Sequence, residues 1–271
     1  PIEFAEITID DRQIYTNEQG IASIRLAEDE YSYTVNAAGF MQFQSGGYFY
    51  SEMDPLIVTL IQGVTDIDGN DYPSVTIGSQ TWIAENLKVT RYRNGDEIQT
   101  GLDDTQWSET TIGAYAIFPH DDIDGLSSET EVLEAYGALY NWYAVDDSRG
   151  LCPTGWRVPS DADWTELTDY LGGVNVAGGK LKSTRTDPDA HPRWDDPNTG
   201  ATDEYGFSAF PGGGRVSGGT FFFFGTNGRW WSSTEFETNA LFRIMFYDDV
   251  NVVSNNTQKE YGMSVRCVRD N

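Results

Sequence analysis

Two stretches of this sequence say most about its larger part. The first runs Gly137-Ala-Leu-Tyr-Asn-Trp-Tyr-Ala-Val145 and resumes as Leu151-Cys-Pro-Thr-Gly-Trp-Arg-Val-Pro-Ser-Asp-Ala-Asp-Trp164. The second begins Arg229-Trp-Trp-Ser-Ser-Thr-Glu235 and ends Tyr261-Gly-Met-Ser-Val-Arg-Cys-Val-Arg269. They place the only two cysteines, Cys152 and Cys267, in aromatic, strand-like segments that lie far apart in the sequence. This arrangement is typical of a fold closed by one long-range disulfide, and not of a catalytic centre.

The composition favours strands and loops and excludes several kinds of partner. The chain has 271 residues, of which 14% are aromatic, and a formal net charge of -26. Abundant aromatic residues without long apolar helical periodicity favour strands. So strong a negative charge should repel nucleic acid and anionic membrane surfaces, while it suits neutral glycans, cations or basic partners. Solubility of an extracellular surface explains the same acidity without any ligand.

The two cysteines bear on whether the protein is exported from the cell. Their count alone does not distinguish a disulfide from two free thiols, but neither lies in a CxxC pair. A Cys152–Cys267 disulfide would indicate an exported protein, secreted or at the cell surface. The sequence shows no signal peptide and no membrane span, yet it begins at Pro1 without Met. We therefore expect a processed or trimmed chain whose precursor carries the export signal and a lipid anchor.

Residues 1–62 are predicted to form a small β-sandwich. Period-two alternation predicts strands near residues 7–9, 21–26, 31–35 and 56–61. The region resembles the carboxypeptidase-regulatory-like family at Tyr15-Thr-Asn-Glu-Gln-Gly20, Tyr31-Ser-Tyr-Thr-Val35 and Ala38-Gly-Phe40. Such modules normally open with another strand, and we expect that strand to be missing or cut short here. An open sheet edge would accept a strand from elsewhere, so strand exchange is expected at this domain.

Residues 63–271 are predicted to form one larger α+β unit, rich in loops. Its best helix covers residues 161–171, with Ser160 as N-cap and Trp164, Leu167 and Leu171 on one face. A glycine pair, Gly172-Gly173, should end this helix. A second, short helix is predicted within residues 129–143, and terminal strands at 240–247 and 263–268.

This larger unit resembles the Fibrobacter succinogenes major paralogous domain, over residues 66–270. Beyond the two stretches quoted above, the matching blocks include Asp66-Ile-Asp-Gly-Asn70, Val75-Thr-Ile-Gly-Ser-Gln-Thr-Trp-Ile-Ala-Glu-Asn-Leu-Lys88 and Gly206-Phe-Ser-Ala-Phe-Pro-Gly-Gly213. It departs from the family at Arg157 and in an Asp-rich insertion near 119–134. The resemblance implies a C-type-lectin-like or formylglycine-generating-enzyme-like fold and a secreted or lipid-anchored surface location. It implies no defined activity.

Two acidic stretches are candidates for a calcium site. In the first, Asp66, Asp68 and Asn70 offer oxygen ligands at alternating positions, as at the start of a calcium loop. An EF-hand would require Glu at its twelfth position, which is Ile77, so an Asx turn explains this stretch equally well. The second candidate comprises Asp121, Asp122 and Asp124. The Glu-Pro-Asn, Gln-Pro-Asp and Trp-Asn-Asp tripeptides of calcium-dependent lectins do not occur.

The densest aromatic block provides the candidate ligand surface. In a continuous strand, Phe221, Phe222, Phe223 and Phe224 would place two rings on each face, which leaves one pair for stacking on a sugar. Trp230 and Trp231 are further candidates, although paired tryptophans in a strand usually place one ring in the core.

The sequence offers little evidence for an enzymatic function. The two histidines, His120 and His191, lie in no recognisable catalytic motif, and among 43 acidic residues some close pairs are inevitable. We therefore expect a non-catalytic surface binding or adhesion module whose partner is a glycan or another surface protein. A pilus-tip or structural assembly component is the alternative, and a polysaccharide-active enzyme is a second one.

Overall fold

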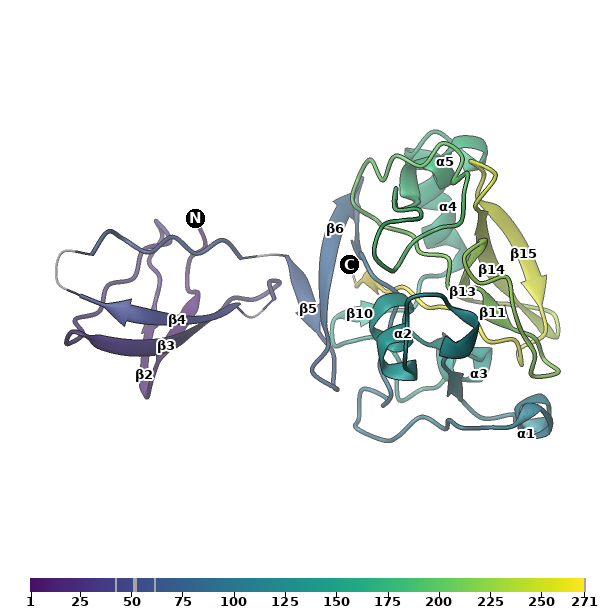
Figure 1. Cartoon of the computed structure of the whole chain (residues 1–271), viewed down its shortest axis with the longest axis horizontal. Helices are drawn as coiled ribbons and strands as arrows, with labels where there is room; N and C mark the ends of the chain where they lie inside the picture. The colour runs from purple at the N-terminus through teal and green to yellow at the C-terminus, as the bar shows by residue number, and fades with distance from the viewer. Residues whose placement is uncertain (42, 51–52, 61, 271) are drawn as a thin grey trace. The chain divides into compact units, whose positions relative to one another are not determined.

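A computed structural model describes residues 1–41, 43–50, 53–60 and 62–270 (Figure 1). The chain divides into two compact units, unit 1 (Pro1–Val64) and unit 2 (Thr65–Asn271). Each unit is described by itself. Within the described residues no helix has the length and apolar character needed to cross a membrane.

Unit 1 is built on one antiparallel sheet of order β2-β1-β3-β4. Its strands are β1 (Glu6–Ile9), β2 (Arg12–Tyr15), β3 (Asp29–Asn36) and β4 (Phe43–Phe49). Alternation along β1 and β3 turns Ile9, Tyr33 and Val35 inward, where Ala5 joins them in a small core. The carboxypeptidase-regulatory-like assignment of this unit stays a prediction.

Two of the predicted strands in unit 1 are extended but form no ladder. Residues 21–27 alternate strictly, with Ala22, Ile24 and Leu26 half-buried and the residues between them exposed. Val58 and Leu60 likewise turn toward the core, while Ile57 is 88% exposed. In the described part of unit 1 neither segment belongs to a sheet, and Ile61, the end of the second predicted strand, lies outside the described residues.

A five-stranded sheet of order β10-β16-β7-β6-β5 belongs to unit 2, except that β5 spans the boundary between the units in the sequence. Its strands are β5 (Gly63–Thr65), β6 (Asp71–Ile77), β7 (Gln80–Ile83), β10 (Trp156–Arg157) and β16 (Val268–Arg269). The β6–β7 hairpin turns at Gly78, whose φ of 62° suits glycine. A Cβ atom there would also lie 2.8 Å from the Tyr170 ring. Only β16 remains of the strand predicted at 263–268.

A three-stranded antiparallel sheet of order β13-β14-β15 forms the second layer of unit 2. Its strands are β13 (Asn227–Phe236), β14 (Asn239–Phe246) and β15 (Val253–Thr257). The strand predicted at 240–247 is thereby confirmed as β14. Two short pairs complete the strands, β8 (Tyr115–Ala116) with β9 (Leu139–Tyr140) and β11 (Gly214–Arg215) with β12 (Phe221–Phe222).

The predicted helix of unit 2 is confirmed as α4 (Asp161–Tyr170). Ser160 and Asp163 form a capping box, in which each side chain accepts a hydrogen bond from the other residue's backbone. Burial alone would raise the pKa of Asp163, but hydrogen bonds from Arg157 and Ser160 hold it below its usual value.

The remaining helices differ in part from expectation. They are α1 (Asp104–Glu109), the 3-10 turn η1 (His120–Asp122), α2 (Glu129–Tyr136), α3 (Trp142–Val145) and α5 (Val174–Leu181). The single helix expected within 129–143 is two helices separated by β9. Helix α5 was not predicted because it contains Gly178 and Gly179, which disfavour helix. The structure needs them, since a Cβ at Gly178 would lie 2.4 Å from the Asn251 carbonyl oxygen.

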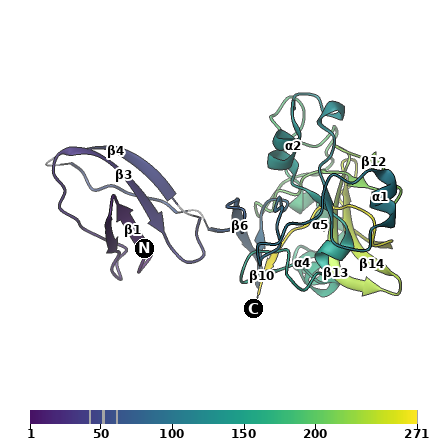
Figure 2. The same ribbon diagram turned by 90° about the horizontal axis from the view of Figure 1, so that it is seen from below.

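The core of unit 2 lies between its two larger sheets, with α4 between them (Figures 1 and 2). Trp82 of β7 and Trp164 of α4 have ring centroids 4.8 Å apart, and Trp230 of β13 lies 6.4 Å beyond Trp164. The predicted disulfide is confirmed, because Cys152 and Cys267 are bonded and buried. Unit 2 is thus a sheet-rich α+β domain, as the sequence predicted.

A buried lysine organises the loops after α5. The Lys182 ammonium donates hydrogen bonds to the carbonyl oxygens of Thr199, Phe246 and Asp249 at 2.9–3.0 Å. It also lies 5.4 Å from the centre of the Trp194 ring. Burial lowers the pKa of Lys182 to about 8, while neighbouring aspartates oppose that shift. The side chain therefore joins the loop at Thr199 to the end of β14 and the turn that follows it.

Candidate functional site

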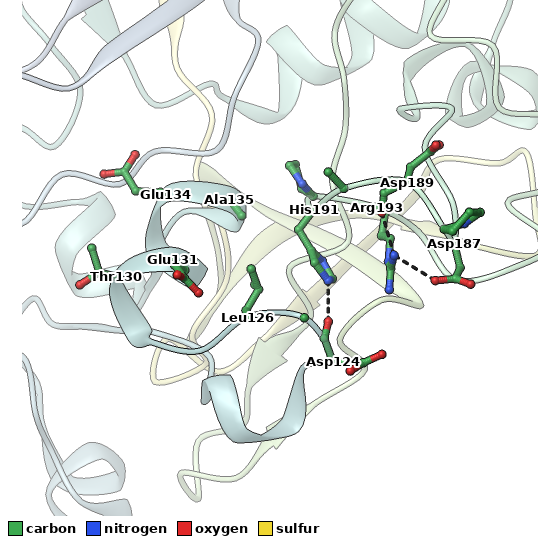
Figure 3. A pocket seen from close by; sticks show the side chains of 14 residues that line it. Asp124, Leu126, Thr130, Glu131, Glu134, Ala135, Asp187, Asp189, His191 and Arg193 are labelled. Carbon is green, nitrogen blue, oxygen red and sulfur yellow. Dashed lines mark hydrogen bonds and ion pairs between the residues drawn. The ribbon is translucent and has the colours of Figure 1, made fainter.

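The described part of unit 2 contains an open pocket of about 740 Å³ between α2 and the loop of residues 187–193 (Figure 3). One wall is the exposed side of α2 with the Asp124–Leu126 turn before it. The other wall is the Asp187-Pro-Asp-Ala-His-Pro-Arg193 loop. The pocket therefore joins the Asp-rich insertion noted in the sequence to a loop more than 50 residues further along.

Local hydrogen bonds set the start of α2. The Ser128 side chain caps the helix by accepting a hydrogen bond from the Glu131 amide at 3.2 Å. In return, the Glu131 carboxylate accepts hydrogen bonds from the Ser127 amide at 2.7 Å and from its hydroxyl at 2.9 Å. These bonds lower the pKa of Glu131. Glu131 is thus a fixed, ionised acceptor on the pocket wall.

His191 links the two walls of the pocket. Its Nε2 lies 2.8 Å from the Asp124 carbonyl oxygen (Figure 3). Its Nδ1 lies 2.7 Å from the Tyr136 hydroxyl. Because a carbonyl oxygen only accepts, Nε2 carries a hydrogen and donates it to Asp124. The Tyr136 hydroxyl also lies 3.2 Å from the Arg193 carbonyl oxygen, to which it donates in the geometry of the structure. The same hydroxyl accepts from the Arg193 amide at 3.0 Å. Burial raises the pKa of Tyr136 to about 12, so this hydroxyl remains a donor at neutral pH.

Five acidic residues line the pocket with the histidine, and two of them have cationic partners. Glu134 pairs with Lys88 at 2.7 Å, and Asp187 pairs with Arg193 at 2.9 Å. The Arg193 guanidinium also donates to the Asp189 carbonyl oxygen at 2.7 Å. With Asp124 and Glu131 the lining is rich in hydrogen-bond acceptors. Such a surface suits a ligand that carries several hydroxyl or ammonium donors.

The predicted calcium ligands do not assemble into a cluster. Asp66 accepts hydrogen bonds from the Asp68 and Asn70 amides and, through its other oxygen, from the Asn70 side chain and the Tyr72 hydroxyl. Asp68 accepts from Thr90 and Arg91. Asp121 and Asp122 lie exposed in η1. Among the described residues no group of three or more His, Cys, Asp or Glu side chains is arranged to hold a metal ion. The calcium site stays a prediction, and the first stretch has the geometry of an Asx turn.

The structure removes both tryptophans from the candidate ligand surface. Trp230 and Trp231 are fully buried on opposite faces of β13. Their indole nitrogens donate to the Asn86 side chain at 2.8 Å and to the Tyr140 carbonyl oxygen at 2.7 Å. An exposed stacking role for these rings was therefore the wrong expectation, since sheets and loops cover both faces of the strand.

The four phenylalanines do not alternate as a continuous strand would. Strand β12 ends at Phe222, and Phe223 adopts a left-handed φ of 55°. Phe221 and Phe224 both pack against Phe118, with ring centroids 5.2 and 4.8 Å away. Phe223 is 59% exposed. The turn thus leaves Phe223 exposed, while Phe221, Phe222 and Phe224 are half-buried.

Sequence reasoning included Asp124 but missed the rest of the pocket. The sequence placed His191 in no recognisable catalytic motif, and its contact with Asp124 spans 67 positions. The Asp-Pro-Asp-Ala-His-Pro run was the available signal, because it places one of only two histidines beside two acidic residues.

Unit 2 is a sheet-rich α+β domain with one long-range disulfide and a pocket lined by acidic residues. A comparison with known families identifies the family to which it belongs. The chain belongs to the family described as the Fibrobacter succinogenes major domain, whose model matches residues 75–269. The resemblance expected from the sequence is thereby confirmed. Neither the curated proteins nor the solved structures gave a match.

Proposed function

We propose that this chain is a non-catalytic binding module of an exported bacterial surface protein, and that a glycan occupies the pocket between α2 and residues 187–193. The observation that supports this most is the set of five acidic residues that line an open pocket of about 740 Å³ together with His191. Carboxylates accept hydrogen bonds from sugar hydroxyls, often in pairs. The family membership agrees with a surface-associated domain. We also propose that unit 2 has a C-type-lectin-like fold.

The lining suits binding better than hydrolysis. A glycosidase needs one carboxylic acid with a raised pKa to protonate the leaving group. At Glu131 the pKa is lowered instead, by hydrogen bonds from Ser127. We therefore expect a neutral or amino-containing glycan to bind without being cleaved.

A glycan array, run with calcium and again with chelator, tests the proposal. Ala190 is exposed on the pocket rim. The variant Ala190→Trp should fill the pocket and abolish the array signal, while Thr105→Trp, on the exposed side of α1, should leave it unchanged. Signal that survives Ala190→Trp would reject the pocket as the site. Hydrolysis products in the bound fraction would favour the polysaccharide-active enzyme instead.

A second candidate function, a structural component of a surface assembly, is favoured by unit 1. Residues 21–27 and 56–60 are extended, present alternating apolar side chains and form no ladder among the described residues. Such segments are available to pair with a strand from another chain. Hydrogen exchange of the monomeric protein at low concentration tests this candidate. Fast exchange of the residue 22–26 amides is expected if these segments are unpaired, and slow exchange would contradict the candidate.

A further inference from the structure

Arg229 on β13 is a partly buried cation without a carboxylate partner in the described part of the chain. Its Nε is buried and makes no hydrogen bond. With the Asn227 amide turned to its favourable orientation, one terminal nitrogen of Arg229 donates to the Asn227 oxygen at 3.2 Å. By contrast, Arg215 pairs with Asp104 at 3.1 Å and Arg243 pairs with Asp161 at 2.5 Å. An unpaired guanidinium is unexpected in a chain with 43 acidic and 17 basic residues.

Aromatic rings frame this guanidinium. Its central carbon lies 5.0 Å from the ring centre of Phe222, 5.8 Å from that of Phe223 and 5.7 Å from that of Phe242. The Tyr261 ring stands perpendicular to Phe222, at 6.3 Å. Because the chain turns at Phe223, that ring remains 59% exposed beside the cation. The result is a platform of rings around one positive charge, which we call the Arg229 platform.

The charge on the platform is only partly compensated. Burial lowers the pKa of Arg229 to about 10, so the group is still cationic at neutral pH. Contacts with ring faces offset part of the cost of burying a cation. They do not satisfy the guanidinium donors, and an unsatisfied buried donor is costly. A ligand carboxylate would supply the missing charge by accepting hydrogen bonds from the terminal nitrogens, while the buried Nε lies out of its reach.

We propose that the Arg229 platform binds the carboxylate of a uronic acid in an acidic glycan, at a site that shares no lining residue with the pocket beside α2. The exposed ring of Phe223 suits the C–H face of a pyranose ring, while Arg229 binds its carboxylate. The overall negative charge of the protein opposes long polyanions at a distance. At 0.15 M ionic strength such repulsion is screened beyond about 8 Å, so a short oligosaccharide reaches the platform.

Calorimetric titration of the full chain at 0.15 M NaCl tests the proposal. The probes are trigalacturonate and neutral galactotriose, which differ in the carboxylate but keep the same ring stereochemistry. We expect trigalacturonate to bind about 10- to 100-fold more tightly, the range of a charge-assisted hydrogen bond. Equal or weaker binding of the acid would overturn the proposal. So would binding of a tripeptide with a free carboxyl terminus when trigalacturonate does not bind.

Three variants separate recognition from folding. Arg229→Met keeps an apolar stem and should reduce trigalacturonate affinity to that of galactotriose. Asparagine tolerates the left-handed backbone at position 223, so Phe223→Asn removes the ring without added strain. This variant should reduce the affinity for both probes. It also provides a test if Arg229→Met does not fold. Ala190→Trp blocks the other pocket and should leave trigalacturonate binding unchanged. A preference for the acid that persists in correctly folded Arg229→Met protein would overturn the assignment.

Discussion

Unit 1 and unit 2 are both rich in aromatic residues, and they use them in opposite ways. In unit 1, Tyr15, Tyr48 and Tyr50 are each more than half exposed, and four apolar residues form the buried core. All eight tryptophans belong to unit 2, where they are buried. The difference follows from how each core is covered. Unit 2 has two larger sheets with α4 between them, whereas unit 1 has one described sheet. Unit 2 therefore stabilises itself, and unit 1 has apolar surface to offer a partner.

The largest effect should come from the tryptophan core. Removing the Trp164 ring would leave a cavity between α4 and both sheets, and we expect Trp164→Ala to cost about 3–5 kcal/mol of unfolding free energy. Guanidinium titration followed by tryptophan fluorescence measures it, since this signal arises from unit 2 alone. The matched substitution in unit 1, Tyr33→Ala, should leave the fluorescence transition unchanged. An equal shift from Tyr33→Ala would break the comparison between the units.

The disulfide should contribute almost as much, again to unit 2 only. It joins positions 115 residues apart, and removing such a link typically costs about 2–5 kcal/mol. The double variant Cys152→Ser with Cys267→Ser should lower the denaturation midpoint, and adding reductant to the wild-type protein should reproduce that value. A midpoint that reductant leaves unchanged would show that the core alone determines the stability of unit 2.

The pH dependence of stability should reflect Lys182. Its pKa is about 8 in the folded protein, against about 10.4 in an unfolded chain. Between those values the unfolded chain holds a proton that the folded chain lacks, so stability should rise with pH from about 8 to 10, by up to about 3 kcal/mol. Thermal melts across this range measure the slope. Lys182→Met should flatten it and the half-exposed control Lys180→Met should not; the same slope in both variants would contradict the assignment.

The smallest effect on stability should come from the exposed residues of unit 1. Because Ile57 is 88% exposed, Ile57→Ser should change the unfolding free energy by less than about 0.5 kcal/mol. If the extended segment 56–60 pairs with other chains, the same change should reduce self-association in sedimentation velocity experiments at high protein concentration. Wild-type protein that stays monomeric at every concentration would argue against self-pairing through this segment.

Local determinants explain what the sequence predicted correctly. Helix α4 was predictable because Ser160, Asp163 and the spacing of Trp164 and Leu167 act within one helix. The disulfide was predictable from the aromatic segments around each cysteine. The two halves of the helical region 129–143 were not separable, because β9 between them depends on pairing with β8.

Long-range contacts explain what the sequence did not predict. Alternation of the phenylalanine run failed because the backbone turns at Phe223, and nothing in four identical residues marks that position. The pocket depends on a hydrogen bond between His191 and Asp124, which the fold brings together. The burial of both Trp230 and Trp231 depends on covering layers supplied by distant segments.

The Cys152–Cys267 bond also determines what a single cut in the backbone does to this protein. Together with the intervening chain it closes a covalent ring, and the exposed loop of residues 187–190 lies inside that ring. One cleavage by a protease within the ring opens it without releasing a fragment, so both sides stay tethered. Mass under non-reducing conditions would change only by one added water, and two pieces would separate only after reduction. A protein working among extracellular proteases would thereby keep its exposed loops without losing its C-terminal strands at the first cut.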